Sequence, residues 1–328
     1  MQHVHWGIIG CGDVTEKKSG PGFAKAKGSD LVAVMRRDAA KAKDYAARHN
    51  VPRWYSKAED LLQDADVNAV YIATPPAYHL SYTIMAAEAG KPVYVEKPMA
   101  INVKECEKML EVCRQNGVPL YIAYYRRALP RFLKVKQLID SGALGEIHSF
   151  AITLHKPPSE TDKGPHTLWR VDPSISGGEY FIDLATHTLD LIDYLFGPIT
   201  EVHGFAVNRA GLYAAEDNVT AIFKTKSHLM GSGIWSFSTL NEEDEVRING
   251  TRGSLSFASF QDKPIVLNTD TQQEEFFIDN PQHVQQPLIQ TVVDELLGLG
   301  TCPSTGQSGL RTTRITDEIL KGYYQTLY

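Results

Sequence analysis

The sequence predicts an α/β protein of two parts: an N-terminal domain with a parallel sheet, and a C-terminal α+β domain with a large, mostly antiparallel open sheet. Up to residue 124, short apolar runs alternate with helical patterns, as expected of βαβ units. From Glu146 onward, β-rich runs follow one another with hairpin signals between them. The 328 residues suit about two domains, which we place at 1–124 and 125–328.

The composition excludes several classes of protein. A hydrophobic content of 43% and a charged content of 22% are ordinary for a globular protein. The net charge of -6, without any basic block, argues against a nucleic-acid or membrane-surface partner. The first residues lack a signal-peptide pattern, and no apolar run could span a bilayer. Four cysteines without CxxC spacing indicate reduced thiols. We therefore expect a cytoplasmic protein.

The first strand and the turn after it suggest a nucleotide site. An apolar run, 4–9, leads into Gly10-Cys11-Gly12-Asp13-Val14-Thr15. Glycines between a strand and a helix let the backbone turn tightly and approach a pyrophosphate, whose charge the helix N-terminus favours. Thr15 occupies the third glycine position, so the match is partial, and an ordinary strand–loop–helix turn would explain it about as well. Gly20-Pro21-Gly22 should interrupt or end the first helix. The candidate cofactor contacts here are Gly10, Cys11, Gly12, Asp13 and Val14.

The end of the second strand bears on cofactor choice. The run 30–35 ends at Arg36-Arg37-Asp38, and 39–49 reads as a helix. An acidic residue at this place binds the ribose hydroxyl of NAD, whereas an arginine accommodates the 2′-phosphate of NADP. Basic residues at a helix N-terminus oppose the macrodipole, so a bound phosphate explains them better than solvent does. Arg36, Arg37 and Lys41 favour NADP, and Asp38 leaves NAD possible.

The alternation continues to the end of the first domain. We expect helices at 58–63, 78–89 and 103–116, and strands at 69–73, 93–95 and 120–124. Together they predict a Rossmann fold. The strand 93–95 stops at Glu96-Lys97-Pro98, since proline cannot extend a ladder. Ligands of open parallel sheets bind outside the carboxyl ends of the strands. This strand therefore delivers Lys97 to the place where a ligand would lie.

Three motifs carry a family resemblance. Thr74-Pro75-Pro76-x-x-His79, then Ala86-Ala87-Glu88-Ala89-Gly90-Lys91-Pro92-Val93, then Glu96-Lys97-Pro98 occur in this order. The combination resembles the Gfo/Idh/MocA family of NAD(P)-dependent sugar oxidoreductases, and the resemblance extends over essentially the whole chain. It implies cofactor contacts from Ala73, Thr74, Pro75, His79, Glu96 and Lys97.

The second half reads as a sheet with a few helices. A helix at 130–141 precedes strands expected at 146–155, 201–208, 218–226, 228–237, 245–249, 254–257 and 265–268. Their alternating pattern fits a sheet with one face on helices. The other face often forms a dimer interface in the resembled family, which implies a homodimer or homotetramer. Helices are expected again at 283–297 and 309–327. His283 could reach the cleft, although a histidine at a helix start is the more ordinary interpretation.

One helix, 177–197, interrupts these strands. Asp183 and His187 are spaced i, i+4, so their side chains should meet on one face, which Asp190 continues. A carboxylate beside an imidazole raises its proton affinity. Such pairs are commonly structural, but GGxxxxDxxxH is the second signature of the resembled family. The resemblance also implies that Trp169 and Arg170, in the loop before this helix, contact cofactor or substrate.

These residues suggest hydride transfer. Lys97 would polarise a substrate oxygen, His187 would exchange the proton, and Asp183 would orient His187. Candidate substrate contacts are Lys97, Tyr124, Arg170, Asp183 and His187. No residue group resembles a zinc site, and we expect no metal. The predicted protein is an NADP(H)-preferring oxidoreductase acting on a sugar, a sugar derivative or a related polyol or diol. Two alternatives stay open: a glycoside hydrolase that uses NAD in a transient oxidation, and a non-catalytic dinucleotide or sugar sensor.

Overall fold

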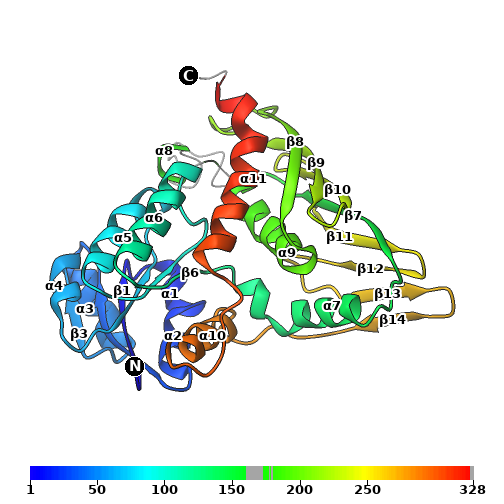
Figure 1. Ribbon diagram of the computed structural model, residues 1–328. Coiled ribbons are helices and arrows are strands. Elements are labelled where there is room, and N and C mark those ends of the chain that lie inside the picture. The colour runs from blue at the N-terminus through cyan, green and yellow to red at the C-terminus, as the bar shows by residue number, and fades with distance from the viewer. Residues whose placement is uncertain (160–172, 177, 179, 326–328) are drawn as a thin grey trace. The chain divides into compact units, whose positions relative to one another are not determined.

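The computed structural model describes residues 1–159, 173–176, 178 and 180–325 (Figure 1). The chain forms two compact units. The first unit comprises Met1–Leu129 and Asn280–Leu310, and the second comprises Pro130–Asp279 and the residues from Arg311 on. This division differs from the expected 1–124 and 125–328 in two ways. The first unit extends to Leu129, beyond its last strand. It also includes Asn280–Leu310, because residues of this segment pack on its sheet.

The first unit is built on a six-stranded sheet of order β3-β2-β1-β4-β5-β6. All its strand pairs are parallel. This confirms the predicted Rossmann arrangement, whose crevice lies where the strand order reverses. The edge strand β3 was not expected from the sequence. The strands are β1 (Val4–Ile9), β2 (Ser29–Met35), β3 (Arg53–Tyr55), β4 (Ala69–Ile72), β5 (Val93–Val95) and β6 (Leu120–Ile122).

Helices contribute apolar residues to a buried cluster on each face of this sheet. One cluster joins the sheet to α4 (Ala58–Gln63), α5 (His79–Glu88) and α6 (Val103–Gln115). The other joins it to α2 (Gly20–Lys25), α3 (Ala39–Arg48) and α10 (Gln286–Leu296). Helix α10 comes from the returning segment and lies beside α2 (Figure 1). Two 3-10 turns, η1 (Pro76–Tyr78) and η2 (Tyr125–Ala128), follow β4 and β6.

The first helix is interrupted, as the Gly20-Pro21-Gly22 run predicts. Helix α1 (Asp13–Lys17) ends after five residues, and α2 starts anew at Gly20 with Pro21 in its first turn. Proline is tolerated there because the first amides of a helix have no intrahelical acceptor. A bulkier residue at position 20 would collide, since an added Cβ would meet the carbonyl oxygen of Thr15 and the hydroxyl of Tyr45.

The second unit contains an eight-stranded sheet of order β14-β13-β12-β11-β7-β10-β9-β8. Its pairs are antiparallel except for β7 with β10, so the predicted mostly antiparallel sheet is confirmed. The last strand, β14, was not expected. The strands are β7 (Ile147–His155), β8 (Ile199–Val207), β9 (Asn218–Thr225), β10 (Met230–Ser236), β11 (Glu243–Gly250), β12 (Gly253–Phe257), β13 (Ile265–Thr269) and β14 (Gln273–Phe276).

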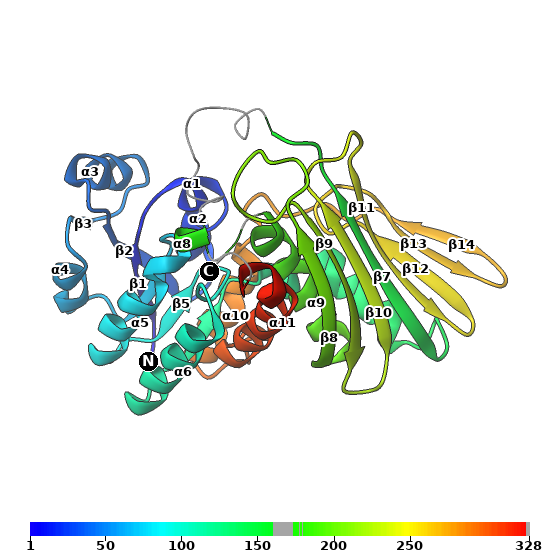
Figure 2. The ribbon, with the colours of Figure 1, turned by 90° about the horizontal axis from the view of Figure 1, so that it is seen from above.

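Helices cover one face of the second sheet (Figure 2). Helix α9 (Thr186–Phe196) follows a π-helical turn, η5 (Phe181–Ala185), and aromatic rings of both pack on that face. The ring centroids of Phe196 and Phe150 are 5.9 Å apart, and those of Phe181 and Trp235 are 5.2 Å apart. The other helices are α7 (Pro130–Asp140), α8 (Pro173–Ser176) and α11 (Gly306–Gln325). Among the described residues, no helix combines the length and apolar character that a bilayer span needs.

Candidate active site

The glycine turn brings the ends of β1 and β4 together. Gly10 has a φ of 94°, a conformation that favours glycine. A Cβ there would lie 2.8 Å from Thr74 Cγ2 and 3.0 Å from the carbonyl of Ala73. The amides of Gly10 and Cys11 donate to the carbonyl of Met35, at 2.9 and 3.2 Å. At Gly12 the nearest atom to such a Cβ is 3.8 Å away, so this backbone is open to a close approach.

Threonine at the third glycine position is accommodated locally. Thr15 is fully buried, and its hydroxyl donates to the carbonyl of Gly12 at 2.7 Å. The hydroxyl of Tyr45 donates to the carbonyl of Thr15 at 2.8 Å. The close packing that the third glycine usually permits is thus moved to Gly20. Asp13 is exposed and Val14 is half-buried in α1, next to this turn.

The residues after β2 divide into two groups. The guanidinium of Arg36 donates to the carbonyl of Cys11 at 3.1 Å, and that of Arg37 lies 5.4 Å from the ring centre of Tyr78. Arg36 is therefore held beside the glycine turn, and Arg37 lies beside η1, the 3-10 turn that follows β4. Asp38 instead caps α3 by accepting from the Lys41 amide at 3.1 Å, and this bond holds the pKa of Asp38 below its usual range. The ammonium of Lys41 lies 3.6 Å from the same carboxylate.

His79 joins the loops that follow β4 and β5. Its side chain is fully buried, with Nε2 2.8 Å from the carbonyl oxygen of Thr74 and Nδ1 3.1 Å from that of Pro98. Burial lowers the pKa of His79. The ring therefore braces the backbone of the candidate site. By contrast, Oγ1 of Thr74 is buried and has no hydrogen-bond partner among the described residues, while Ala73 and Pro75 are half-buried beside it.

Glu96 is a carboxylate enclosed by donors. It is only 6% exposed. Oε1 accepts from the hydroxyl of Tyr71 and from Nε2 of Gln285 at 2.6 Å, and Oε2 accepts from the amide of Lys97 at 3.2 Å. Burial, followed by the nearby Glu96 carboxylate, raises the pKa of the Tyr71 phenol well above its usual value, so Tyr71 remains a donor. These bonds fix the backbone at which Lys97 leaves β5.

Lys97 and Tyr124 follow neighbouring strands of the first sheet. Lys97 is half-buried two residues after the end of β5, and its peptide bond to Pro98 is cis. Its placement at the carboxyl end of the sheet agrees with the sequence argument. Tyr124 follows β6, and its side chain is wholly buried in the core cluster shared with α5 and α6. A substrate contact by Tyr124 stays a prediction.

The segment before α10 adds residues that sequence reasoning missed. Gln285 is 1% exposed and reaches Glu96 from 189 positions away in the chain. The backbone amide of Gln285 donates to the carbonyl of Lys18 at 3.2 Å. Nδ1 of His283 lies 2.8 Å from the carbonyl of Lys17, and Nε2 lies 2.8 Å from the ammonium of Lys25. His283 therefore ties the start of α10 to α1 and α2, which agrees with the helix-start interpretation.

In the second unit, Asp183 and His187 lie on either side of a change in helix type. Asp183 is half-buried in η5, and His187 is 4% exposed in the first turn of α9. The sequence argument assumed one α-helix from 177 to 197. A π-turn has i→i+5 bonds and is frequent at functional sites, so the spacing between the two side chains differs from the assumed i, i+4 geometry. Their pairing stays a prediction.

The loop after β12 contacts His187 through Phe260. The ring of Phe260 meets the His187 ring edge-on, with centroids 6.2 Å apart. The buried carboxylate of Asp244 accepts from the amides of Ser259, Phe260 and Gln261 at 2.9, 2.7 and 2.9 Å. The Asp244 carboxylate thus anchors a loop that lies 15 to 17 residues further along the chain, and no local sequence pattern reveals a contact over that separation.

The two carboxylates of α9, those of Asp190 and Asp193, accept hydrogen bonds from residues of α11. Asp193 accepts two bonds of 2.7 Å from the guanidinium of Arg311, and Asp190 accepts from the hydroxyl of Thr312 at 3.4 Å. These contacts tie α9 to α11. Trp169 and Arg170 lie outside the described residues.

Comparison with known proteins identifies the family. The profile of an oxidoreductase family with an NAD-binding Rossmann fold matches residues 4–124, and that of the GFO/IDH/MocA C-terminal domain matches 132–256. An oxidoreductase of Formosa agariphila is 40% identical over 316 residues, which cover 96% of this chain and 97% of the relative. The trans-1,2-dihydrobenzene-1,2-diol dehydrogenase of Bos taurus is 27% identical over 251 residues, covering 76% and 72% of the two chains.

A solved structure shares the fold. Levoglucosan dehydrogenase in complex with NADH and levoglucosan matches with a TM-score of 0.87 at 21% identity, covering 99% of this chain and 98% of the other. The two profiles together span most of the chain, and their order agrees with its two sheets. The chain therefore belongs to the Gfo/Idh/MocA family of oxidoreductases, with an NAD-binding Rossmann fold at its N-terminal end.

Proposed function

We propose that the protein is an NADP(H)-preferring oxidoreductase that moves a hydride between nicotinamide and a carbinol or carbonyl carbon of a sugar, a sugar derivative or a related polyol or diol. The observation that supports this most is the anchored Glu96–Lys97 step at the end of β5, in a chain of this family. The substrate class is supported by relatives named for acting on a dihydrodiol and on an anhydro-sugar.

The described residues fit a bound dinucleotide. The backbone at Gly12 is open, and Gly10 permits the turn that exposes it. The buried Oγ1 of Thr74 is a polar atom that a ligand group could satisfy. Gly10, Gly12 and Thr74 would hold the cofactor, together with the half-buried Pro75. When bound, the nicotinamide would supply the site that accepts or donates hydride.

Three side chains have distinct roles in this proposal. Lys97 donates a hydrogen bond to the reacting oxygen and stabilises the charge that develops on it. His187 takes the hydroxyl proton in oxidation or returns it in reduction, a task that typically contributes about 10²–10⁴-fold. Phe260 limits the movement of the His187 ring, and Asp183 orients it.

The NADP preference is supported by Arg36 and Arg37. The Arg36 guanidinium contacts the glycine turn and that of Arg37 lies over Tyr78 of η1, and both follow the end of β2, where a 2′-phosphate would be read. Asp38, the acidic residue that could bind the ribose hydroxyls of NAD, caps α3 instead. The Lys41 ammonium is partly neutralised by Asp38 and adds less.

Titration of the purified protein with each nucleotide tests this preference. We expect tighter binding of NADP than of NAD. Arg37→Ala should weaken NADP binding by about tenfold or more and leave NAD binding nearly unchanged, since a charged hydrogen bond is lost only for NADP. The matched control is Arg114→Ala, whose guanidinium pairs with Glu111 on α6. Equal or tighter binding of NAD by the unaltered protein would overturn the preference.

A homodimer or homotetramer formed through the second sheet is also part of this proposal. On the face opposite α9, large apolar side chains of three neighbouring strands are exposed: Phe205 is 81%, Ile222 59% and Met230 65% exposed. Several large apolar side chains exposed on one sheet face support an interaction surface there.

A further inference from the structure

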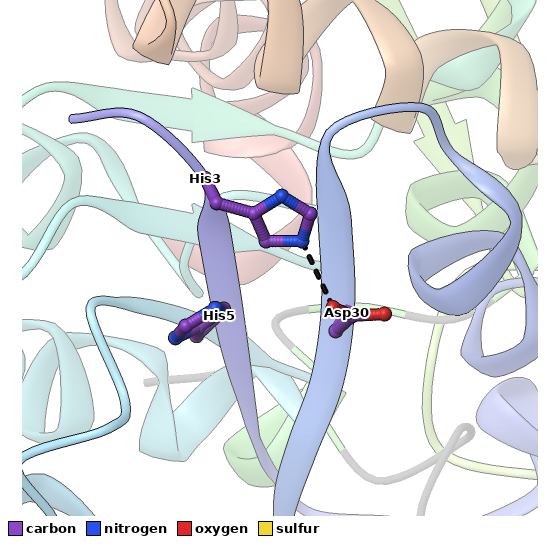
Figure 3. Close-up of side chains that lie close together, drawn as sticks. All are labelled: His3, His5 and Asp30. Atoms are coloured by element: carbon purple, nitrogen blue, oxygen red, sulfur yellow. Dashed lines mark hydrogen bonds and ion pairs between the residues drawn. The ribbon is translucent and has the colours of Figure 1, made fainter.

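The side chains of His3, His5 and Asp30, all of types that can bind a metal ion, lie close together at the amino-terminal ends of β1 and β2 (Figure 3). His5 lies on β1 directly opposite Asp30 of β2 in the strand register. His3 directly precedes β1, and its ring centroid lies 5.2 Å from that of His5. One ligand atom from each residue lies within 4.8 Å of the other two. Asp30 is distant from both histidines in the chain, which is why the sequence suggests no metal site.

The hydrogen bonds of the cluster orient both imidazoles. Nδ1 of His5 lies 3.2 Å from the carbonyl oxygen of Asp66. A carbonyl can only accept, so Nδ1 carries the proton in the neutral ring and the lone pair is on Nε2. Metal-binding histidines usually donate their second N–H to a carbonyl or carboxylate in this way. Nε2 of His3 lies 2.9 Å from Oδ2 of Asp30.

The backbone that carries the histidines is fixed by one side chain. Oδ1 of Asn68 accepts from the amide of His5 at 2.7 Å, and Nδ2 of Asn68 donates to the carbonyl of His3 at 2.9 Å. The two imidazoles therefore project from a braced strand end. An ordinary surface ion pair would explain the contact of His3 with Asp30, but it would not require His5 to be oriented beside them.

The ligand atoms, all within 4.8 Å of one another, can reach the spacing that zinc requires after small side-chain movements. Zinc bonds to histidine and carboxylate ligands are about 2.0–2.2 Å long, which places tetrahedral ligand atoms about 3.3–3.4 Å apart. Closing the widest gap needs a movement of about 1.4 Å at most. His3 and Asp30 can make it by side-chain rotation, since their side chains are 41% and 62% exposed. Two imidazoles and one carboxylate form a ligand set typical of zinc, with the remaining position open to water.

We propose that His3, His5 and Asp30 bind a divalent transition-metal ion, for which Zn²⁺ is the best match. The ion would join β1 to β2 at their amino-terminal ends. Gly10 lies at the other end of β1, about 16 Å away along the strand. The ion therefore stabilises the first unit without entering the hydride-transfer chemistry.

Calorimetric titration of metal-free protein with Zn²⁺ tests this site. We expect one ion per chain, and a rise in the thermal unfolding temperature on adding Zn²⁺. His5→Gln and Asp30→Asn should each weaken Zn²⁺ binding by at least the roughly tenfold that loss of an outer-shell partner of a ligand typically costs, because each removes a direct ligand. His148→Gln, which alters an exposed strand histidine outside the cluster, should change nothing.

Two results would overturn the proposal: no saturable Zn²⁺ binding, or binding that His5→Gln and Asp30→Asn leave unchanged. Nucleotide binding tests whether the metal site is independent of the candidate active site. NADP and NAD affinities of His5→Gln should equal those of the unaltered protein, and a parallel loss of nucleotide affinity would contradict a separate site.

Discussion

At the scale of residues, the candidate site depends on how a buried carboxylate is satisfied. An ionised carboxylate in the interior is tolerated when several hydrogen bonds replace its water. Glu96 obtains them from the Tyr71 hydroxyl, the Gln285 side chain and the Lys97 amide. The same bonds hold the backbone of Lys97, so the stability of this network and the position of Lys97 are linked.

Removal of the Gln285 side chain tests this network. Gln285→Ala should lower the free energy of unfolding by about 1–3 kcal/mol, because Glu96 loses one donor and remains buried. Gln282→Ala, on an exposed side chain of the same segment, is the matched control and should have little effect. Urea unfolding measures both. A loss no larger than that of the control would contradict the role assigned to Gln285.

A second residue-scale prediction concerns pH. The Arg48 side chain, followed by His49, lowers the pKa of Glu16 from 4.5 to about 2. A lowered pKa stabilises the folded protein above the unfolded value, and this contribution disappears as the pH falls from about 4.5 toward 2. Glu16→Gln should cost up to about 1 kcal/mol at neutral pH, since the pair is partly exposed. The difference between variant and unaltered protein should narrow on acidification.

The measurement for Glu16 is urea unfolding at several pH values. Glu88→Gln, at an exposed glutamate near the end of α5, is the control. A difference at Glu16 that stays constant between neutral and acidic pH would show that the carboxylate charge is not the cause.

At the scale of elements, the break between α1 and α2 sets the path of the chain beneath the glycine turn. Gly20 lies against the Thr15 carbonyl and the Tyr45 hydroxyl, and these two groups are themselves hydrogen-bonded. A methyl group has no room there unless the backbone shifts. The helical glycine at position 322 is different, because a Cβ there would meet nothing within 4 Å.

Two alanine substitutions should therefore have opposite effects. Gly20→Ala should destabilise the protein by about 1–3 kcal/mol, as overpacking does. Gly322→Ala, inside the long helix α11, should be neutral or stabilise it by up to about 1 kcal/mol. Thermal unfolding of the two variants separates them. Equal effects on both would contradict the packing argument.

The sequence predicts helices and strands well where the period of the hydrophobic residues agrees with the residues that end an element, such as glycine and proline. The predicted helix 39–49 corresponds to Ala39–Arg48, and the strand ending at Glu96 is Val93–Val95. The pattern fails at the sheet edges. Strand β3 has three residues, and β14 is Gln-Glu-Glu-Phe, so neither buries enough apolar surface to give a signal. The π-turn at 181–185 is also invisible to a helical period.

At the scale of the whole molecule, the sequence contains little information on contacts between distant segments. The Glu96–Lys97–Pro98 motif marks the candidate site locally, but its partner Gln285 is 189 positions away and has no motif of its own. The return of 280–310 to the first unit likewise depends on packing of α10 against α2, and no local pattern signals it. Contacts of the exposed sheet face with a second chain would likewise have no local sequence signal.

Charge placed on the exposed sheet face should prevent assembly. Ile222→Glu buries a carboxylate at the proposed interface, so sedimentation should show a monomer where the unaltered protein is a dimer or tetramer. Leu240→Glu, at an apolar residue that is 90% exposed in the turn after β10, should leave the assembly unchanged. An oligomer that survives Ile222→Glu, or a monomeric unaltered protein, would contradict the proposal.

The most direct test of the central claim is the change in nicotinamide absorbance with a panel of sugars, anhydro-sugars and vicinal diols. It should be measured on the unaltered protein, on Lys97→Met and on Lys108→Met, an exposed control on α6. We expect net reduction or oxidation of NADP(H) by the unaltered protein and by Lys108→Met. Lys97→Met should lose at least about a hundredfold in kcat while still binding the nucleotide. Normal turnover by Lys97→Met would contradict the role of Lys97 on which the proposed mechanism depends.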